Sequence, residues 1–297
     1  MKAAITGIGS MVGFHLARRL SEEGHTVVGV DIASGANTDD LESLANITLH
    51  QVDIANLKKL REAFRGADVI YNLAAVSSER LVKENFPLAL RVNVTGTANC
   101  LEIAKETGAK LVYASSAAVY PDPGKAYRES DACLPGTMYG TTKFISEEFA
   151  RLYNKNFDVR FTILRFERIY GSRMKRNPVY DMALAFSKNK KVVMYESLEC
   201  EYDFIHVSDA VNALVMANEA AWDNREVNIG TGKTVKLGTI YDTFRDITGN
   251  DPGVDIKNDK KGKDLLNTEL ARSLGWEPRC SLKEGVEETV KYFSNAK

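Results

Sequence analysis

Short runs of apolar residues alternate with longer amphipathic stretches over the first half of the chain. The short runs are typical of buried parallel strands, and the stretches between them have helical spacing. The predicted strands are Lys2–Thr6, Thr26–Val30, Ile47–Gln51, Val69–Leu73, Leu111–Ala114 and Phe161–Arg165. The predicted helices are Gly13–Glu23, Leu57–Phe64, Leu88–Thr107 and Tyr139–Asn154. This alternation predicts an α/β fold, a doubly wound parallel sheet that binds ligands at the carboxyl ends of its strands.

The pattern becomes looser after residue 167. A basic stretch at 172–178 precedes one more predicted strand, Phe204–Val207, and then a helix that opens at Ser208 or Asp209. Residues 281–284 form a capping box before a predicted final helix, since the Ser and Glu side chains can each satisfy a free amide. We therefore predict a main domain and a smaller C-terminal substrate-binding region over its sheet edge. The main domain is 1–167 with 201–220 returning to it, and the smaller region is 168–200 and 221–297.

Composition and charge favour a small-molecule partner. The 297 residues carry a formal net charge of -1, which gives no electrostatic case for a nucleic-acid or membrane surface. The four cysteines stand far apart and the four histidines show no ligand spacing, so the sequence predicts neither a disulfide framework nor a metal site. The absence of a signal-like or membrane-spanning apolar run predicts a cytoplasmic protein.

A glycine-rich turn at residues 7–13 follows the first predicted strand and leads into a helix. Small residues there let the backbone approach a pyrophosphate at the helix N-terminus, although glycines also serve tight turns for conformational reasons alone. Asp31 follows the next strand, where a carboxylate can accept hydrogen bonds from ribose hydroxyls. A 2′-phosphate would meet like charge at Asp31, so residues 1–167 are predicted to be a Rossmann domain that binds NAD rather than NADP.

Tyr139 and Lys143 stand four residues apart, on one face of a predicted helix. Among twelve tyrosines such a spacing also arises by chance, as a solvated helix face. Ser116 favours the functional interpretation, because it follows a predicted strand and so lies at the sheet edge that holds the cofactor. A base for an alcohol needs a pKa near the working pH, and an ammonium about 4 Å away supplies roughly 4 kcal/mol toward ionising a phenol. We therefore predict that Ser116, Tyr139 and Lys143 catalyse the oxidation of an alcohol.

These motifs resemble the extended short-chain dehydrogenase/reductase family, the NAD-dependent epimerases and dehydratases of nucleotide sugars. The resemblance covers nearly the whole chain, in ordered motifs at 6–13, 31, 53, 72–75, 93–97, 115–120, 139–143, 164–166, 169–171, 203–209, 227–230 and 274–276. It implies Ser116, Tyr139 and Lys143 as a catalytic triad and Asn93 as a polar support near the site. Asp53 is a candidate for binding the adenine amine or, equally, for capping the next helix. The predicted cofactor-binding residues are Gly7, Ser10, Met11, Gly13, Asp31, Ile32, Asp53, Ile54, Leu73, Ala74, Ala75, Asn93, Tyr139 and Lys143.

Small residues follow the predicted catalytic serine. Ala117 and Ala118 stand where family dehydratases often carry an Asp-Glu pair, so the chain is more similar to the UDP-galactose 4-epimerases. The resemblance therefore implies a nucleotide-sugar 4-epimerase that works through a transient 4-keto intermediate. A dehydratase, a decarboxylase, a sugar dehydrogenase and a catalytically silent NAD-sensing protein are the alternatives. The resemblance also implies a homodimer that packs through the helices predicted at 88–107 and 139–154.

Three positions depart from the family pattern and concern the substrate. Ser10 replaces a glycine, which requires a negative φ at that position. Glu167-Arg168 replaces Phe-Asn, and Tyr202 replaces an Arg that neutralises the substrate diphosphate. Either the substrate has no diphosphate, or basic residues between 168 and 176 bind it; these residues can equally form a solvated loop. The candidates for that charge are Arg168, Arg173, Lys175 and Arg176, and the predicted substrate-binding residues are Ser77, Ser116, Arg168, Arg173 and Tyr202.

Overall fold

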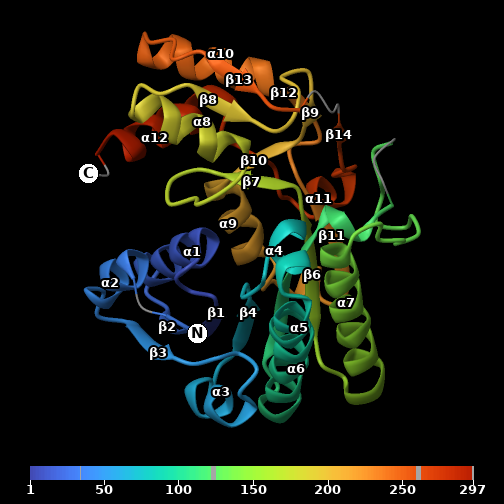
Figure 1. Ribbon diagram of the computed structural model, residues 1–297. Helices are drawn as coiled ribbons and strands as arrows, with labels where there is room; N and C mark the ends of the chain where they lie inside the picture. Colours follow the sequence, from blue (N-terminus) through green and yellow to red (C-terminus); the bar gives the residue numbers. More distant parts are fainter. Residues whose placement is uncertain (34, 122–124, 259–261, 296–297) are drawn as a thin grey trace.

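Seven parallel strands form the central sheet of the computed structural model, which describes residues 1–33, 35–121, 125–258 and 262–295. The strand order is β11-β6-β5-β4-β1-β2-β3, and neighbouring strands are parallel throughout. From one edge to the other the strands are β11 (Arg225–Ile229), β6 (Phe161–Phe166), β5 (Lys110–Ser116), β4 (Val69–Asn72), β1 (Lys2–Thr6), β2 (Thr26–Asp31) and β3 (Ile47–Gln51). The predicted doubly wound α/β sheet is therefore confirmed (Figure 1).

The chain extends the sheet in two directions from β1. Strands β2 and β3 follow on one side of β1, and β4, β5, β6 and β11 follow on the other. Such a reversal leaves a crevice at the carboxyl ends of the strands where it occurs, here between β1 and β4. The glycine-rich turn after β1 and the residues after β4 therefore meet at this crevice.

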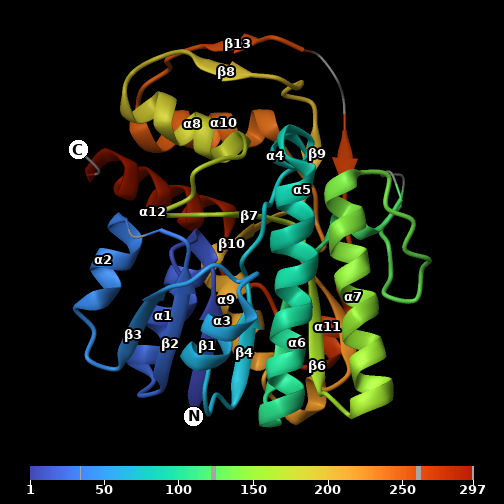
Figure 2. The same cartoon turned by 60° about the horizontal axis from the view of Figure 1, so that its bottom comes forward.

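Helices bury both faces of the sheet. On one face lie α1 (Met11–Glu22), α9 (Val207–Met216) and α11 (Glu269–Ser273), with α2 (Ala36–Glu42) beside α1. On the other face lie α3 (Leu57–Ala63), α6 (Gly96–Thr107) and α7 (Met138–Phe157). Each layer presents an apolar stripe, such as Leu16 and Leu20 on α1 and Leu101 on α6, that is fully buried against the strands. Figure 2 shows α6 and α7 running side by side on the outside of the molecule.

The helix predicted at 88–107 is one helical run in three parts. It comprises α5 (Phe86–Ala89), a π-helical segment η1 (Leu90–Thr95) and α6, and it follows α4 (Glu79–Glu84). A π-helical segment inside a helix often marks a functional site, because it re-aims the side chains that it carries. Here that segment carries the buried Asn93.

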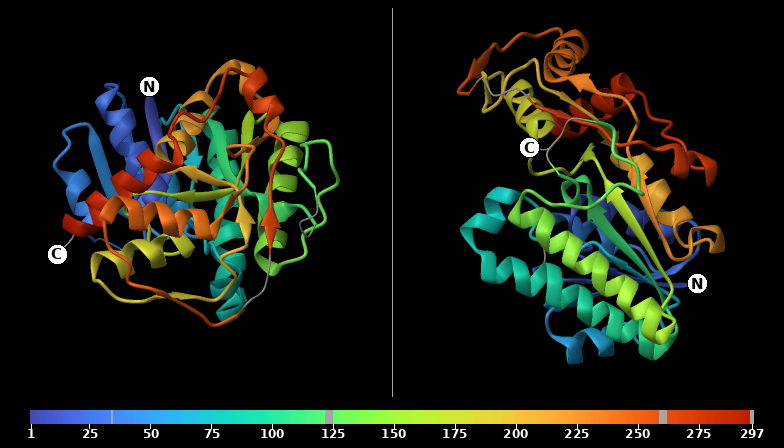
Figure 3. Two further views of the ribbon diagram at one scale, coloured as in Figure 1. Left: turned by 90° about the horizontal axis from the view of Figure 1, so that it is seen from above. Right: turned by 90° about the vertical axis from the view of Figure 1, so that its right-hand side faces the viewer.

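The C-terminal region lies over the carboxyl ends of the strands, as Figures 1 and 3 show. Its helices are α8 (Pro178–Ser187), α10 (Leu237–Thr248) and α12 (Leu282–Asn295), which share an apolar core that contains Met182, Phe186 and Phe244. Its short strands form the pairs β8 (Val192–Met194) with β13 (Val254–Ile256) and β7 (Arg168–Tyr170) with β10 (Phe204–His206), and the group β12 (Val235–Lys236), β9 (Glu201–Tyr202) and β14 (Lys263–Asp264). Two 3-10 turns, η2 (Ala117–Val119) and η3 (Ala220–Trp222), complete the elements of the described residues. The region therefore covers the crevice from above.

Most predicted elements end within a few residues of the observed ones, and two differences concern the division into a main domain and a C-terminal region. The prediction placed all of 221–297 in the smaller region, whereas β11 within it pairs with β6 and extends the main sheet. Its first two residues, Arg225 and Glu226, lie at the sheet edge and are not buried, which hides the apolar pattern of a strand. The predicted strand Phe204–Val207 ends at His206, and α9 begins at Val207 rather than at 208 or 209.

The predicted capping box of the last helix is confirmed. The Glu284 carboxylate accepts a hydrogen bond from the Ser281 amide at 2.9 Å, and the Ser281 hydroxyl accepts one from the Glu284 amide at 3.3 Å. None of the helices within the described residues is long and apolar enough to cross a membrane.

Candidate active site

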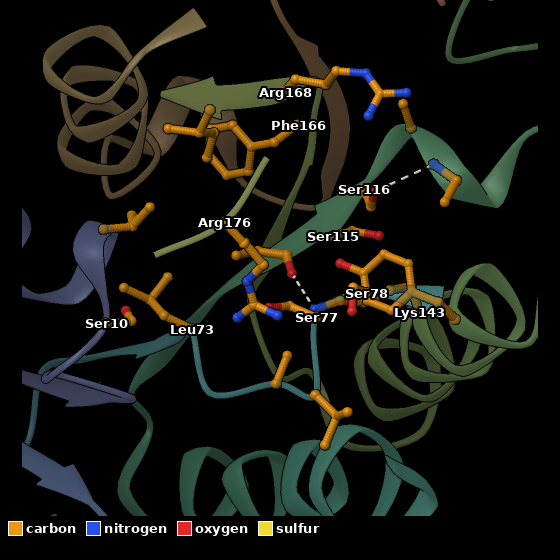
Figure 4. Close-up of a pocket in the computed structure, with 18 of the residues that line it drawn as sticks. Ser10, Leu73, Ser77, Ser78, Ser115, Ser116, Lys143, Phe166, Arg168 and Arg176 are labelled. Carbon is orange, nitrogen blue, oxygen red and sulfur yellow. Dashed lines mark hydrogen bonds between the residues drawn. The ribbon is translucent and has the colours of Figure 1, made fainter. Parts of the chain in front are cut away.

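A cavity of about 1090 Å³ opens at the carboxyl ends of the sheet strands (Figure 4). This volume lies at the upper end of the range for small-molecule sites, so the cavity has room for a cofactor and a second ligand. The predicted site residues that line it are Gly7, Ser10, Met11, Asp31, Ile32, Ile54, Leu73, Ala74, Ala75, Ser77, Ser116, Tyr139, Lys143, Arg168 and Arg173. Those that lie outside its lining are Gly13, Asp53, Asn93 and Tyr202.

The glycine-rich turn holds the backbone close to the end of β4. Gly7 has a φ of 67°, and a Cβ there would lie 2.9 Å from the Ala74 backbone, so only glycine fits. A Cβ at Gly13 would lie 2.3 Å from the Gly7 carbonyl oxygen. Ser10 keeps the required negative φ, -71°, and its hydroxyl accepts a hydrogen bond from the Gly13 amide as the N-cap of α1. The turn therefore forms a cradle of the kind that a dinucleotide pyrophosphate occupies at a helix N-terminus.

Asp31 fixes this cradle from the neighbouring strand. Its Oδ2 accepts a hydrogen bond from the Gly9 amide at 2.9 Å, and its Oδ1 accepts one from the Ile32 amide at 2.8 Å. The carboxylate lines the cavity together with the apolar side chains of Ile32 and Ile54. This combination of an acceptor and apolar walls fits the adenosine half of a dinucleotide.

Asp53 and Asn93 support the site from outside the cavity. Asp53 forms an ion pair with Arg91 at 2.8 Å and accepts a hydrogen bond from the Ala55 amide, whereas Asn56 caps α3. Asn93 is buried, and its Oδ1 accepts a hydrogen bond from the Val76 amide at 2.8 Å. The Asn93 amide group donates in turn to the Thr142 hydroxyl at 2.9 Å. Asn93 thus ties the loop after β4 to α7 at the residue before Lys143.

The three predicted catalytic residues lie together on the cavity wall. Ser116 ends β5, and Tyr139 and Lys143 lie on successive turns of α7. The Lys143 Nζ donates a hydrogen bond to the Ala114 carbonyl oxygen at 2.7 Å and lies 5.9 Å from the centroid of the Tyr139 ring (Figure 4). It also lies 4.8 Å from the centroid of the Tyr113 ring. The ammonium is therefore fixed by a carbonyl and an aromatic face beside the phenol.

The substrate side of the cavity carries the residues that depart from the family pattern. The Arg168 guanidinium stacks 3.9 Å from the centroid of the Tyr202 ring and forms an ion pair with Asp264 at 2.6 Å. Tyr202 is buried behind Arg168, and its hydroxyl donates to Glu196. Tyr202 therefore backs Arg168 instead of reaching the cavity as predicted, because the stacked guanidinium lies between them.

Arg173 is directed to the nucleotide end of the cavity. It adopts a left-handed φ of 66°, and its guanidinium lies 3.7 Å from the centroid of the Phe14 ring on α1. It donates a hydrogen bond to the Asn37 side chain at 2.7 Å and pairs with Asp40. Arg173 thus joins the C-terminal region to the main domain, and its charge is already balanced.

The family model described as "NAD dependent epimerase/dehydratase family" matches residues 3–230. The chain belongs to this family. It is 29% identical to a putative UDP-glucose 4-epimerase of Methanocaldococcus jannaschii over 98% of both chains. It is 28% identical to GDP-mannose 3,5-epimerase 1 of Oryza sativa subsp. japonica over 99% of this chain and 81% of that one. The UDP-glucose 4-epimerase of Thermotoga maritima, solved with UDP-glucose, superposes with a TM-score of 0.92 at 26% identity, covering 99% of this chain and 98% of that one.

Membership in the NAD-dependent epimerase/dehydratase family confirms three predictions, namely the family, an enzyme that acts on sugars, and the NAD cofactor. The relatives differ in nucleotide and in the carbon that they epimerise, so they do not decide the substrate. The glycine cradle and Asp31 fit the cofactor by their own geometry.

Burial dominates the pKa shifts of Tyr139 and Lys143. It raises the pKa of Tyr139 to about 12, although a hydrogen bond with Ser116 and the charge of Arg176 oppose this. It lowers the pKa of Lys143 to about 7, against the charge of Glu147. The predicted phenol pKa near 7 is therefore wrong for the protein alone, since the cavity wall disfavours both charged forms. The phenol is protonated until further positive charge enters the cavity.

A buried ion pair that sequence reasoning missed fixes α7 against the sheet. Arg165 of β6 donates two hydrogen bonds to Glu147 of α7, at 2.7 and 3.0 Å, and both side chains are fully buried. The Ser115 hydroxyl, next to the catalytic serine, donates to the same carboxylate at 2.6 Å. Glu147 follows Lys143 by one helical turn, and this spacing could have indicated that Glu147 lies on the same buried face of α7. A glutamate on a helix normally indicates a solvated face, so the sequence did not suggest burial.

Arg176 and Glu79 also face the cavity outside the predicted set. Arg176 extends into the cavity from the loop before α8 (Figure 4), with no hydrogen bond or ion pair to the described residues. The basic stretch indicated Arg176 only as one of four candidates. The Glu79 carboxylate accepts a hydrogen bond from the Tyr139 amide at 2.9 Å, at the N-terminus of α7. Nothing in the sequence pattern pointed to Glu79.

Replacing the buried lysine should change the pH dependence of stability. A pKa of about 7 in the folded protein against about 10.4 in the unfolded chain gives Lys143 a destabilising contribution, complete below pH 7 and lost as the pH rises toward the unfolded value. The melting temperature of Lys143→Met, relative to the wild type, should therefore be higher at pH 6 than at pH 9. Differential scanning calorimetry at the two pH values checks this. If the melting temperatures of Lys143→Met and the wild type differ by the same amount at pH 6 and pH 9, Lys143 keeps an ordinary pKa.

Proposed function

We propose that this enzyme is a nucleotide-sugar 4-epimerase that acts through a transient 4-keto sugar. The observation that carries this proposal is the arrangement of Ser116, Tyr139 and Lys143 on one cavity wall. The residues directly after Ser116 are Ala117 and Ala118, which form the turn η2 and line the cavity without a carboxyl group. A dehydratase needs such a group to move protons during the loss of water. The wall therefore favours oxidation and reduction at one carbon.

The residues divide the proton chemistry between them. Tyr139 takes the proton of the 4-hydroxyl group and later returns it, with Ser116 hydrogen-bonding the same oxygen in its alcohol and carbonyl forms. Bound NAD supplies the hydride acceptor and, through its ring charge, favours ionisation of the phenol. Lys143, held by the Ala114 carbonyl, adds its own charge beside Tyr139 once it is protonated. Rotation of the keto sugar between the two hydride transfers exchanges the faces of C4.

The wild-type protein should interconvert UDP-glucose and UDP-galactose, or the corresponding pair of another nucleotide, without net accumulation of NADH. Tyr139→Phe should lower kcat by about 10²- to 10⁴-fold because the proton acceptor is lost. Tyr153→Phe is the matched control and should keep the wild-type kcat. Tyr153 lies on the same helix, but its hydroxyl donates a hydrogen bond to Glu102, outside the cavity.

Product analysis by NMR together with absorbance at 340 nm separates the alternatives. Stoichiometric growth of NADH indicates a dehydrogenase, and a keto-deoxy sugar indicates a dehydratase. Loss of a carboxyl group indicates a decarboxylase. Unchanged turnover in Tyr139→Phe contradicts the assigned role.

We infer that Arg168 and Arg176 bind the diphosphate of the substrate. Position 202 carries Tyr instead of the expected Arg, and the cation that stacks on it is Arg168, which lines the cavity. Arg176 brings a second guanidinium with no partner among the described side chains. Arginine suits this role because its planar fork matches two phosphate oxygens. We do not assign Arg173 to the diphosphate, because its guanidinium contacts Phe14 of α1 and Asp40 of α2 at the nucleotide end of the cavity.

Removing either guanidinium should weaken nucleotide-sugar binding more than turnover. Arg168→Ala and Arg176→Ala should each raise KM by roughly 10-fold or more, as expected for a hydrogen bond to a charged group, and change kcat less. Arg245→Ala on α10 is the control, because Arg245 is exposed and pairs only with neighbouring aspartates. Steady-state kinetics with a UDP-sugar checks this, and unchanged KM in both variants would indicate a substrate without a diphosphate.

We also infer a homodimer that packs through the outer faces of α6 and α7. Leu152 and Phe157 of α7 are 49% and 51% exposed, and exposed apolar residues on one of two paired helices favour packing against a second pair. Light scattering should give the mass of two chains, and Leu152→Asp combined with Phe157→Asp should shift it toward one. The mass of a single chain for the wild type would contradict this.

A further inference from the structure

Glu167 presents a carboxyl group to the cavity that no other residue of the described structure binds. It follows β6, its amide donates to the Ile229 carbonyl oxygen at 3.0 Å, and its side chain is 8% exposed on the cavity lining. Its carboxyl makes no hydrogen bond or ion pair with the described residues, and it opens onto the cavity. A ligand in the cavity is therefore the available partner.

The groups around Glu167 are already paired with each other. Asp203 lies against the same glycine, Gly230, and accepts hydrogen bonds from Thr231 and from the Gly232 amide. Asp264 of β14 pairs with Arg168 of β7. The corner thus holds two carboxylates that already have partners, a guanidinium that pairs with Asp264 through its Nη2, and two groups that have no partner among the described residues, the Arg168 Nε and the Glu167 carboxyl.

This environment decides the charge state of Glu167 in the free protein. Burial raises its pKa well above the ordinary value, Asp203 and Asp264 raise it further, and only Arg168 opposes them. These effects favour the protonated carboxyl, which can donate one hydrogen bond and accept another.

The position of Glu167 places it at the sugar end of the cavity. Phe166, the residue before it, is in register with the catalytic Ser116 on the neighbouring strand. Asp31 and Ile32, at the nucleotide end, lie on the other side of the crevice between β1 and β4. Glu167 thus follows Phe166, the residue of β6 that pairs with Ser116 of β5.

We propose that the Glu167 carboxyl recognises the sugar ring of the substrate by hydrogen bonds to its hydroxyl groups. This assignment rests on the proposed function and narrows its substrate class to nucleotide sugars with an uncharged ring. A uronate would bring a further carboxylate close to Asp203, which has only neutral partners, whereas the charge of Asp264 is balanced by Arg168. Glu167 is therefore a specificity-determining residue for hexoses over hexuronates.

Binding to the NAD-loaded protein tests this assignment directly. Isothermal titration calorimetry compares UDP-glucose, UDP-glucuronic acid and UDP, with GDP-mannose and GDP as a second pair. Glu167→Ala should weaken the binding of the sugar nucleotide about 10-fold and leave the nucleoside diphosphate within about twofold. Glu167→Gln keeps a donor and an acceptor, so it should remain within about threefold of the wild type. Glu199→Gln, an exposed residue paired with Lys236, is the control.

The pH dependence separates a neutral acid from a carboxylate. In the wild type the affinity for the sugar nucleotide relative to the diphosphate should fall toward alkaline pH, as Glu167 loses its proton, and in Glu167→Gln this ratio should stay flat. An acid whose pKa is raised by folding favours the folded state at low pH, and this contribution is lost as the pH rises. Glu167→Gln should therefore raise the melting temperature relative to the wild type more at pH 8 than at pH 4.

Three outcomes overturn the assignment. Equal losses in Glu167→Gln and Glu167→Ala would show that a carboxylate is required. A large fall in kcat with unchanged affinity in Glu167→Gln would show that Glu167 transfers a proton instead. If the wild type binds the sugar nucleotide and both Glu167 variants bind it equally well, only the assignment of Glu167 is wrong. If the wild type binds neither the UDP compounds nor the GDP compounds, the proposed function is wrong as well.

Discussion

The packing of α7 against the carboxyl ends of β5 and β6 is the constraint on which the site depends. Tyr139 and Lys143 can reach the cavity only if this helix is held in one register against the strands that carry Ser116 and Arg165. The Arg165–Glu147 ion pair fixes the middle of the helix, and Asn93 fixes it near the catalytic pair. Breaking a buried pair by removing one partner typically costs 3–5 kcal/mol, so the site and the fold share these contacts.

The same burial that positions Tyr139 and Lys143 disfavours the charged form of each side chain. A phenol with a pKa of about 12 beside an amine with a pKa of about 7 does not exchange protons with an alcohol at neutral pH. Positive charge brought into the cavity favours the phenolate, and a negative phenolate in turn favours the ammonium. The charge of a bound cofactor therefore acts in the direction that the proposed proton transfer needs. Glu167 also faces the cavity and has no partner among the described residues.

The sequence predicted the sheet strands well because buried parallel strands leave an uninterrupted apolar signal. Lys2–Thr6 and Ile47–Gln51 match the structure residue for residue. The edge strand β11 was missed because Arg225 and Glu226 interrupt its pattern. Much of the C-terminal region, including α8 and α10, was not assigned to helices or strands. Its short elements depend on contacts between distant segments, and they leave a weak periodic pattern of apolar residues in the sequence.

The candidate site was predicted where a motif determines the geometry, and not where it depends on side-chain partners. The glycine-rich turn and the Tyr139–Lys143 spacing carry their own geometry in the sequence. Tyr202 was assigned to the substrate, but stacking with Arg168 places it behind the wall. Glu167 was noted only as a departure from a pattern, since neither its burial nor the absence of a partner can be read from residue order.

We propose that hydrogen leaves C4 of the sugar as hydride and returns to the same carbon without exchanging with water. The fate of the hydrogen at C4 tests this most directly. A UDP-glucose labelled with deuterium at C4 should give a UDP-galactose that retains deuterium at C4 when the reaction runs in ordinary water. Solvent hydrogen at that carbon in the product would mean that the bond is broken as a proton transfer, which would contradict the account.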